Sequence, residues 1–418
     1  MKKLLPFLMP IALLAVSFGF SDQSNGQITQ AAVQAEASVE YVGDWPADAQ
    51  VAFQAAADIW AETLQAKSPL YIKARWSTSP VPPGGYGEFM ETNVPFSFSG
   101  PFHPIPSASY PELLSNELRD IESTANDAFT IQVNGTQNWY RGVDGNVPND
   151  QFDLMTYALR NIGLGVGFSS RVFFSAREDT GGWGSAANPQ FLTYNIFDHY
   201  LITESNQPLI NNPDIPNHSK TFRNLLVDGK VFLNSELARA QNNGAFPAID
   251  ILDPATASPI DTANIYLTAF LNESAFPPGS PDAFMTPIIE RGEASHEIGP
   301  VTTAILQEFG WNSSPTILST SVIFDTSADS GQGFDLWSIV VDPRYDDDEL
   351  TISISNVADG TAGATVNDGR YLATNSGWTG TITFILNVEN PDGKTTSQTV
   401  TIQFANLDQK IYLPSILR

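Results

Sequence analysis

The segment between residues 154 and 168 constrains the fold of this chain more than any other part of the sequence. Its apolar residues recur every four positions, at Leu154, Ala158, Ile162 and Val166. This spacing predicts one buried face of a helix. The same stretch contains Gly163, Gly165 and Gly167, and each glycine inside a helix costs about 1 kcal/mol relative to alanine. Helix stability alone would not select such a sequence, so another constraint has shaped it.

The composition of the whole chain excludes several classes of function. Its 418 residues predict about two or three domains. The absence of cysteine excludes disulfides, thiolate nucleophiles, iron–sulfur clusters and cysteine-ligated zinc. Asp and Glu outnumber Lys and Arg by 46 to 20, which gives a net charge of -26. A chain this acidic repels a phosphate backbone, so we expect no nucleic acid partner.

The first residues are typical of an export signal. Two lysines precede a short apolar run that contains two prolines, and small residues follow. This pattern predicts a secretory signal peptide over residues 1–21. The alternative is an uncleaved membrane anchor, although the run is short beside the about 20 residues of a membrane span. The polar residues 22–40 predict a linker. The predicted signal peptide indicates export, and no later stretch is long and apolar enough to span a bilayer. We therefore expect a secreted or cell-surface protein.

Helices and strands are both expected between residues 41 and 314. The spacing of Phe53, Ala57, Trp60 and Leu64 predicts an amphipathic helix over residues 49–65. Frequent Pro and Gly predict a long loop over residues 78–106. The other expected elements are helices over 112–118, 154–166 and 300–309, and strands over 70–76, 129–133, 191–202 and 229–233.

The C-terminal part has a different pattern, with short β-rich runs separated by turn signals. The expected strands are 322–324, 336–341, 350–354, 381–388 and 399–404. Residues 390–393 (Asn-Pro-Asp-Gly) predict a hairpin turn. Together these features predict an immunoglobulin-like β-sandwich over residues 315–408. Residues 409–418 form a tail, which is either an export or surface-retention signal or a final edge strand stopped by Pro414.

The usual catalytic motifs are absent from the sequence. No two of its four histidines lie four residues apart, so no helix offers a histidine pair to a zinc ion. No Gly-x-Ser-x-Gly motif of a serine hydrolase occurs. The run from Gly163 to Gly167 lacks the third glycine of a dinucleotide-binding loop at the required offset.

Residues 153–168 resemble the active-site helix of secreted zinc metalloproteases of the metzincin kind, whose pattern is His-Glu-x-x-His-x-x-Gly-x-x-His. Gly167 occupies the glycine at which that helix breaks. Residues 283–287 resemble the Met-turn of the family, with Met285 as its methionine. Segments 52–64, 70–76, 138–145 and 299–311 also occur in the family's order. The resemblance covers roughly residues 40–312 and implies an α+β metalloprotease-like domain over residues 41–314.

The functional positions of this family pattern hold other residues. The resemblance places the first zinc ligand on Arg160, the catalytic glutamate on Asn161, the second ligand on Leu164 and the third on Ser170. A guanidinium repels a cation and leucine has no donor atom. Serine is a poor zinc ligand, and an amide cannot serve as a general base. The resemblance therefore implies no catalytic residues, no metal ligands and no zinc, with Arg160 in the old metal position and paired with a carboxylate.

Other candidate site residues have ordinary structural interpretations beside the functional ones. His199 and His296 suggest ligands, but isolated histidines bonded to water or backbone are the alternative. Asp346, Asp347, Asp348 and Glu349 suggest calcium, although consecutive acids lack the spacing of a calcium loop and favour a solvated turn. Trp139 and Tyr140, with Tyr86 and Trp183, are candidates for lining a cleft, with core packing as the alternative.

The sequence thus predicts an α+β chain, with a metzincin-like domain followed by an all-β immunoglobulin-like sandwich. We expect a pseudo-metalloprotease that binds a protein, a peptide or a cell-surface ligand, or has a structural role at the surface. A groove along an edge strand would accept an extended peptide. Two alternatives stay open: an active peptidase or other hydrolase that uses a different site, and an unrelated glycine-rich core helix.

Overall fold

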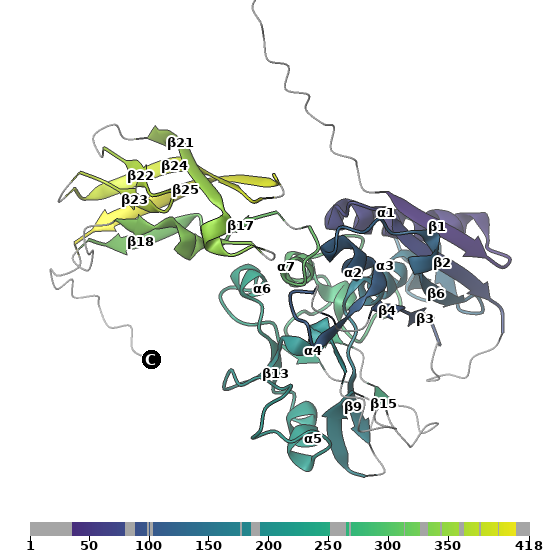
Figure 1. Ribbon diagram of the computed structural model, residues 1–418. Coiled ribbons are helices and arrows are strands. Elements are labelled where there is room, and N and C mark those ends of the chain that lie inside the picture. The colour runs from purple at the N-terminus through teal and green to yellow at the C-terminus, as the bar shows by residue number, and fades with distance from the viewer. Residues whose placement is uncertain are drawn as a thin grey trace, which may run out of the picture. The chain divides into compact units, whose positions relative to one another are not determined.

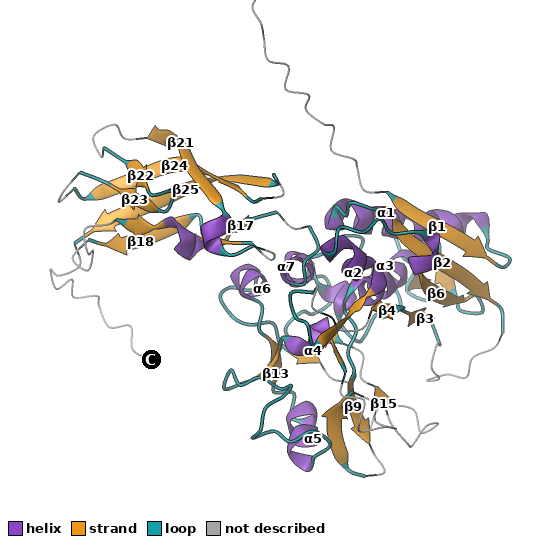
Figure 2. Cartoon of the chain, viewed as in Figure 1, coloured by secondary structure: helices purple, strands orange, loops and turns teal. Residues whose placement is uncertain are grey.

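The computed structural model describes residues 36–79, 88–97, 100, 103–175, 178–184, 193–250, 265–266, 269–312, 314–326, 333–342, 345–358, 363–375, 378–391 and 393–406. The predicted signal peptide and C-terminal tail, and most of the predicted linker, lie outside these residues. The fold is mixed α+β, as the sequence predicts (Figure 2). The helices of the described part are α1 (Ala47–Leu64), α2 (Glu112–Leu118), α3 (Leu154–Val166), α4 (Ile196–His199), α5 (Lys220–Val227), α6 (Glu236–Gln241) and α7 (Pro300–Glu308).

A four-stranded sheet is the framework of the first region, by which we mean the described residues between 36 and 312. Its strands are β1 (Ala37–Val42), β2 (Leu70–Ser77), β6 (Phe129–Asn134) and β3 (Met90–Asn93), in the order β1-β2-β6-β3. The first three strands run parallel, and β3 pairs antiparallel with β6 at the edge. Parallel neighbours require a crossover connection, and α1 provides it between β1 and β2.

Helices α1 and α3 pack against each other beside this sheet (Figure 1). The predicted apolar face of α1 is fully buried, and the indole of Trp60 donates a hydrogen bond to the carbonyl of Leu159 in α3 at 2.8 Å. A Cβ atom on Gly165 would lie only 2.4 Å from the ring of Phe129 in β6. The glycine therefore allows α3 to approach the sheet, which explains a residue that helix propensity disfavours.

Shorter elements complete the first region. The strands are β4 (Phe96–Ser97), β5 (Ala108–Pro111), β7 (Trp139–Tyr140), β8 (Phe152–Asp153), β9 (Val172–Ser175), β10 (Thr180–Trp183), β11 (Tyr194–Asn195), β12 (Leu201–Thr203), β13 (Val231–Leu233), β14 (Ile249–Asp250), β15 (Ile265–Tyr266) and β16 (Phe270–Leu271). Two 3-10 turns are η1 (Ala125–Asp127) and η2 (Ala283–Met285). Strands β11, β5 and β4 form a small sheet, in which β4 follows β3 along the chain after two residues.

The C-terminal region is built from strands and 3-10 turns in its described part. Its elements are β17 (Thr316–Ile317), β18 (Ser321–Asp325), β19 (Phe334–Asp335), η3 (Leu336–Ile339), β20 (Val340–Val341), η4 (Asp347–Glu349), β21 (Thr351–Ala358), β22 (Thr365–Asn367), β23 (Tyr371–Ala373), β24 (Gly380–Glu389) and β25 (Thr395–Ala405). A sheet β18-β25-β24-β21 and a sheet β19-β23-β22 contribute to one apolar cluster. The predicted hairpin turn joins β24 to β25, where the amide of Gly393 donates to the carbonyl of Asn390 at 2.8 Å.

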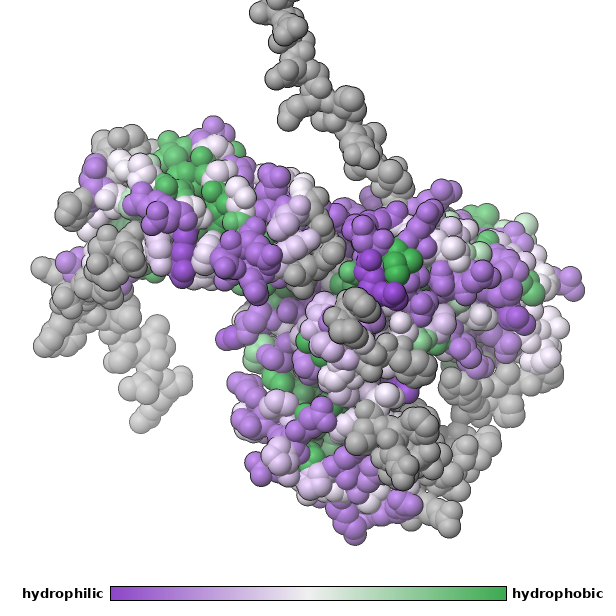
Figure 3. Space-filling model, viewed as in Figure 1, coloured by the Kyte–Doolittle hydropathy of each residue, from purple (hydrophilic) through white to green (hydrophobic). Residues whose placement is uncertain are grey.

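The buried apolar residues fall into two clusters, one between Ala37 and Trp311 and one between Ile317 and Phe404. The boundary predicted near Pro315 lies between them. On the face drawn in Figure 3, hydrophobic residues gather over strands β21 and β24. Strand β21 includes Val357, which is exposed.

Four expectations about local structure are wrong. Strand β1 begins inside the predicted linker, β3 and β4 lie in the predicted loop 78–106, α4 interrupts the predicted strand 191–202, and η3 replaces most of the predicted strand 336–341. These elements are short and depend on distant partners or caps. Strand β1 pairs with β2, β3 pairs with β6, and Asn195 and Asp198 form a capping box around α4. Local sequence patterns carry little information about such contacts.

Candidate functional site

Helix α3 is buried along nearly all of its length. Its N-cap is Asp153, whose carboxylate accepts a hydrogen bond from the amide of Thr156 at 2.8 Å. A Cβ atom on Gly163 would lie 2.9 Å from the sulfur of Met285, which is itself fully buried in η2. The structure therefore brings the helix and the predicted Met-turn into contact, although they lie more than a hundred residues apart in sequence.

Arg160 is buried, with 9% of its surface exposed. Its guanidinium donates to the carbonyls of Thr286 at 3.3 Å and Pro287 at 3.1 Å, directly after η2. It also lies 4.6 Å from the ring centre of Tyr157 and 5.5 Å from that of Phe270. Burial lowers the pKa of this guanidinium, whereas Tyr157 acts in the opposite direction. The carboxylates of Glu293 and Glu273 also favour the charged form. The expected carboxylate pair is not among the ion pairs of the described residues, in which carbonyls and aromatic rings hold Arg160.

Asn161 occupies the next position of the family pattern and is also buried. Its side-chain amide donates to the carbonyl of Tyr157 at 2.8 Å, and its side-chain oxygen accepts from the hydroxyl of Thr92 at 3.0 Å. Thr92 belongs to the edge strand β3, so Asn161 connects the helix to that strand. Leu164 is partly buried and packs against the main apolar cluster.

Ser170 is held by a buried aspartate that the sequence analysis did not single out. The hydroxyl of Ser170 donates to the carboxylate of Asp198 at 2.6 Å. The same carboxylate accepts from the backbone amides of Arg171 and Asn195, both at 2.9 Å. Burial raises the pKa of Asp198 to about 6, and these hydrogen bonds act in the opposite direction. The carboxylate fixes the segment after α3 to the start of α4.

A cleft of about 390 Å³ lies between the edge strand and this segment. One side is formed by Thr92, Val94 and Phe96, and the other by Ser169, Ser170, Arg171, Gly184 and Asn195. Of Arg160, Asn161, Leu164 and Ser170, only Ser170 lines this cleft. The side chains of Arg160 and Asn161 form hydrogen bonds inside the protein, and Leu164 packs against the main apolar cluster.

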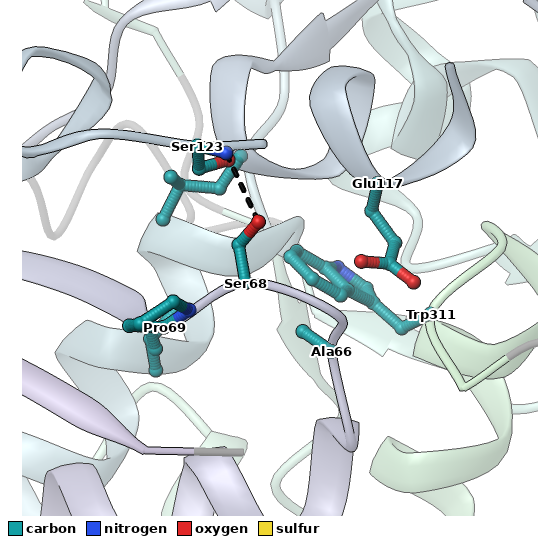
Figure 4. Close-up of a pocket in the computed structure, with 8 residues that line it drawn as sticks. Ala66, Ser68, Pro69, Glu117, Ser123 and Trp311 are labelled. Carbon is teal, nitrogen blue, oxygen red and sulfur yellow. Dashed lines mark hydrogen bonds between the residues drawn. The ribbon is translucent and has the colours of Figure 1, made fainter. Parts of the chain in front are cut away.

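A second cavity lies beneath α2 (Figure 4). The carboxylate of Glu117 points toward the indole of Trp311 there, and the amide of Ser123 donates to the hydroxyl of Ser68 at 3.0 Å. The volume is about 10 Å³, which accommodates about one water molecule. It is too small for a peptide. A neighbouring cavity lined by Lys67 and Asp120 has a volume of about 210 Å³, and the cleft beside β3, at about 390 Å³, is the larger candidate binding site.

The aromatic residues proposed for a cleft do not line this one. Trp139 is buried, and its indole donates to the carbonyl of Asn134 at 2.8 Å. The hydroxyl of Tyr140 bonds to the carboxylate of Asp144. Trp183 is buried against Tyr194, and residue 86 lies outside the described residues. The core-packing interpretation holds for both tryptophans because their large rings find apolar partners in the first region.

His296 has a specific partner rather than water or backbone alone. Its Nε2 atom lies 2.7 Å from the carboxylate of Asp153, and that hydrogen bond raises the pKa of the imidazole. The nearest hydroxyl on this carboxylate is that of Thr156, at 2.6 Å, but Thr156 is fully buried. A substrate cannot reach that hydroxyl, so the pair does not form part of a hydrolytic triad. His199, by contrast, lies at the exposed end of α4 and packs beside Tyr194.

The acidic run in the C-terminal region forms the turn η4. The amide of Asp346 donates to the carboxylate of Glu349 at 3.1 Å, which caps this turn. Across the described ranges, no three His, Asp or Glu side chains come together in a way that could hold a metal ion. Nor does any helix of the described part have the length and apolarity that a membrane span requires.

Comparisons with protein-family models, with curated proteins and with solved structures give no match. The interpretation of the site therefore depends on the contacts described above.

Proposed function

We propose that this chain is a secreted or cell-surface pseudo-metalloprotease that binds an extended peptide in the cleft beside β3 and does not hydrolyse it. In this proposal residues 41–314 are a metzincin-like domain and residues 315–408 an immunoglobulin-like sandwich that serves attachment or spacing. The observation that carries the proposal is the cleft of about 390 Å³ along an edge strand. Active peptidase or other hydrolase activity at a different site is the alternative.

The backbone of β3 supports peptide binding at its outer edge. The carbonyl of Phe89 accepts from the amide of Asn134 at 2.9 Å, so this pair is hydrogen-bonded across the β3–β6 ladder. Hydrogen-bonded and non-bonded pairs alternate in an antiparallel ladder. Met90 and Thr92 therefore direct their backbone N–H and C=O groups away from β6. An extended peptide can pair with such an edge and place alternate side chains in the cleft.

The contacts of Arg160 support the loss of metal chemistry. A permanently charged guanidinium beside the Met-turn-like segment disfavours a second cation there. Two carbonyls, one buried and one partly buried, and two aromatic rings hold it in place. Asn161 has no basic atom that could accept a proton from water. The binding proposal therefore needs no contribution from zinc.

Metal analysis and a broad protease assay test the absence of turnover. The purified mature chain is compared with a fourfold variant, Arg160→His, Asn161→Glu, Leu164→His and Ser170→His. We expect no stoichiometric zinc and no chelator-sensitive proteolysis in the parent chain, and zinc uptake in the variant. Zinc bound tightly beside Arg160 in the parent chain would overturn the proposal. A failure of the folded variant to take up zinc would count against the metzincin-like assignment.

Edge-strand pairing is tested by a proline in β3. Met90→Pro removes an N–H that faces away from β6, so the ladder with β6 keeps its hydrogen bonds. Met90→Ala shortens the side chain and keeps the N–H, which makes it the matched control. We expect peptides that bind the parent chain and Met90→Ala to bind Met90→Pro at least tenfold more weakly. Equal affinities for the two variants would contradict pairing at this edge.

A second candidate function is hydrolysis by Ser170, because its hydroxyl lines the cleft and bonds to Asp198 at 2.6 Å. The carboxylate would act as the general base. However, the same hydroxyl oxygen accepts from the amide of Val172 at 2.9 Å, which favours a structural role. Peptide hydrolysis that persists in a chelator and disappears in Ser170→Ala would establish this candidate in place of the binding role.

A further inference from the structure

We infer that Arg171 makes the cleft selective for a peptide that presents a carboxylate. This inference depends on the proposed function, since it names the ligand chemistry of the same cleft. It does not depend on Arg160, whose guanidinium is buried elsewhere against carbonyls.

The guanidinium of Arg171 is held in a defined orientation. Its Nε donates to the side-chain oxygen of Asn195 at 3.1 Å, and one terminal nitrogen donates to the hydroxyl of Thr193 at 2.9 Å. The group also lies 5.5 Å from the ring centre of Phe96, which lines the same cleft. These contacts use two of the five N–H donors of an arginine, and a planar fork suits a carboxylate.

The partners that orient this cation are neutral. The ion pairs of the described residues involve other cations, namely Lys67, Lys73, Arg141, Lys220, Arg223, Lys230, Arg239, His296 and Arg370. The nearby carboxylate of Asp198 is attracted electrostatically to Arg171, but its hydrogen bonds come from the backbone amide of Arg171 and from Ser170 rather than from the guanidinium. A carboxylate from outside would therefore find donors that no acidic side chain of the described region occupies.

The rest of the cleft fits a peptide carrying such a group. Val94 and Phe96 offer apolar contacts beside the arginine, and Ser169 and Asn195 offer polar ones. Because the chain has a net charge of -26, a general attraction for acidic peptides is absent. Any preference for a carboxylate must come from a local cation, and among the residues that line the cleft Arg171 is the cationic one.

The test compares matched hexapeptides labelled with an uncharged BODIPY fluorophore that lacks a carboxylate, with extended sequences rich in Val and Thr and an amidated C-terminus. One series carries Asp and the other Asn, and the variable residue is moved along the peptide. A third series lacks Asp but has a free C-terminus, so side-chain and terminal carboxylates are distinguished. Dissociation constants are measured by fluorescence anisotropy with the full mature chain.

We expect the best Asp peptide, or the free C-terminus, to bind about tenfold more tightly than its neutral match, since charge-assisted hydrogen bonds have that effect. Arg171→Gln should abolish the difference and Arg171→Lys should keep part of it. Arg141→Gln is the control, because it makes the same charge change at a residue paired with Asp48 outside the cleft.

The outcomes separate the two proposals. Equal binding of Asp, Asn and free C-terminal peptides, with loss of binding in Met90→Pro, would retain the proposed function and overturn the role of Arg171. A preference for carboxylates that persists in Arg171→Gln would also overturn it. Absence of binding by every peptide would contradict the proposed function itself.

Discussion

Arg160 and Arg171 lie eleven residues apart, and the regions around them differ in what a cation does there. Arg160 is buried and donates to carbonyls of the chain itself. Arg171 is half-buried, lines a cleft and is oriented by an amide and a hydroxyl. The first cation is part of the core, whereas the second lines a space that a ligand can enter. The comparison shows that two arginines close together in the sequence can differ in whether a ligand is able to reach them.

The largest expected effect is the loss of stability when Arg160 is replaced by alanine, compared with the same replacement at Arg171. Arg160→Ala would leave the buried carbonyl of Thr286 and the partly buried carbonyl of Pro287 without this donor. It would also remove a side chain packed beside two rings, so we expect a loss of about 3–5 kcal/mol in the free energy of unfolding. Arg171→Ala should cost about 1 kcal/mol, because its hydrogen bonds are partly exposed. Urea unfolding of both variants measures these losses. Equal losses would break the comparison.

The next largest effect is the pH dependence of stability that we expect from Asp198, whose carboxylate accepts a hydrogen bond from the backbone amide of Arg171. Its pKa is raised from 3.8 to about 6 in the folded protein. The folded state therefore holds an extra proton between these values, and the associated stability is present below about pH 4 and lost as the pH rises through 6. Two pKa units correspond to roughly 3 kcal/mol.

The measurement is urea unfolding of the parent chain and Asp198→Asn from pH 4 to pH 8. The stability of the parent relative to the variant should fall by roughly 3 kcal/mol over this range. Since Asn does not titrate, the other acids cancel in the difference. A pH-independent difference would show that burial does not perturb this carboxylate.

A substitution at Gly165 tests the packing of α3, the helix that contains Arg160 and precedes Arg171. Alanine would favour the helix by about 1 kcal/mol, but its Cβ would lie 2.4 Å from the ring of Phe129. Overpacking of this kind costs about 1–3 kcal/mol, so we expect Gly165→Ala to give a net loss of stability of about 1 kcal/mol. Thermal unfolding of this variant is the measurement, with a double variant Gly165→Ala and Phe129→Leu as control. An increase in stability from Gly165→Ala alone would contradict the close approach.

The smallest effect comes from His296, which is hydrogen-bonded to Asp153, the N-cap residue of α3. Its pKa is raised by the hydrogen bond to Asp153. The charged form therefore stabilises the fold below its unfolded pKa of about 6.5, and this contribution is lost as the pH rises through the folded pKa. We expect His296→Gln to cost about 1 kcal/mol at pH 5.5 and less at pH 9. The same cost at both pH values would exclude a charged histidine.

Much of the local structure follows from the sequence. The apolar spacing in residues 49–65 and 154–166 predicts helices that the structure confirms as α1 and α3, and residues 112–118 match α2. Long periodic segments carry their own signal because one face must be buried. The edge strand β3 was predicted to be a loop, since four residues in a Pro- and Gly-rich stretch become a strand only by pairing with β6.

The candidate site was predictable in part. The pattern around Gly167 led to Arg160, Asn161, Leu164 and Ser170, but not to the partners that explain them. Asp198 lies 28 residues beyond Ser170 and belongs to no motif. Arg171 follows the motif directly, yet only its neutral partners and the cleft give it a role.

By itself, the sequence determined which residue types stand at the four positions and that none of them suits a zinc ion. This follows from their chemistry alone, because a guanidinium or an isobutyl group cannot donate electrons to a cation in any fold. The tertiary structure decided that Arg160 is enclosed while Arg171 faces a cleft. Exposure and hydrogen-bond partners come from segments distant in the chain, such as η2, α4 and β4, and no local pattern specifies how they meet.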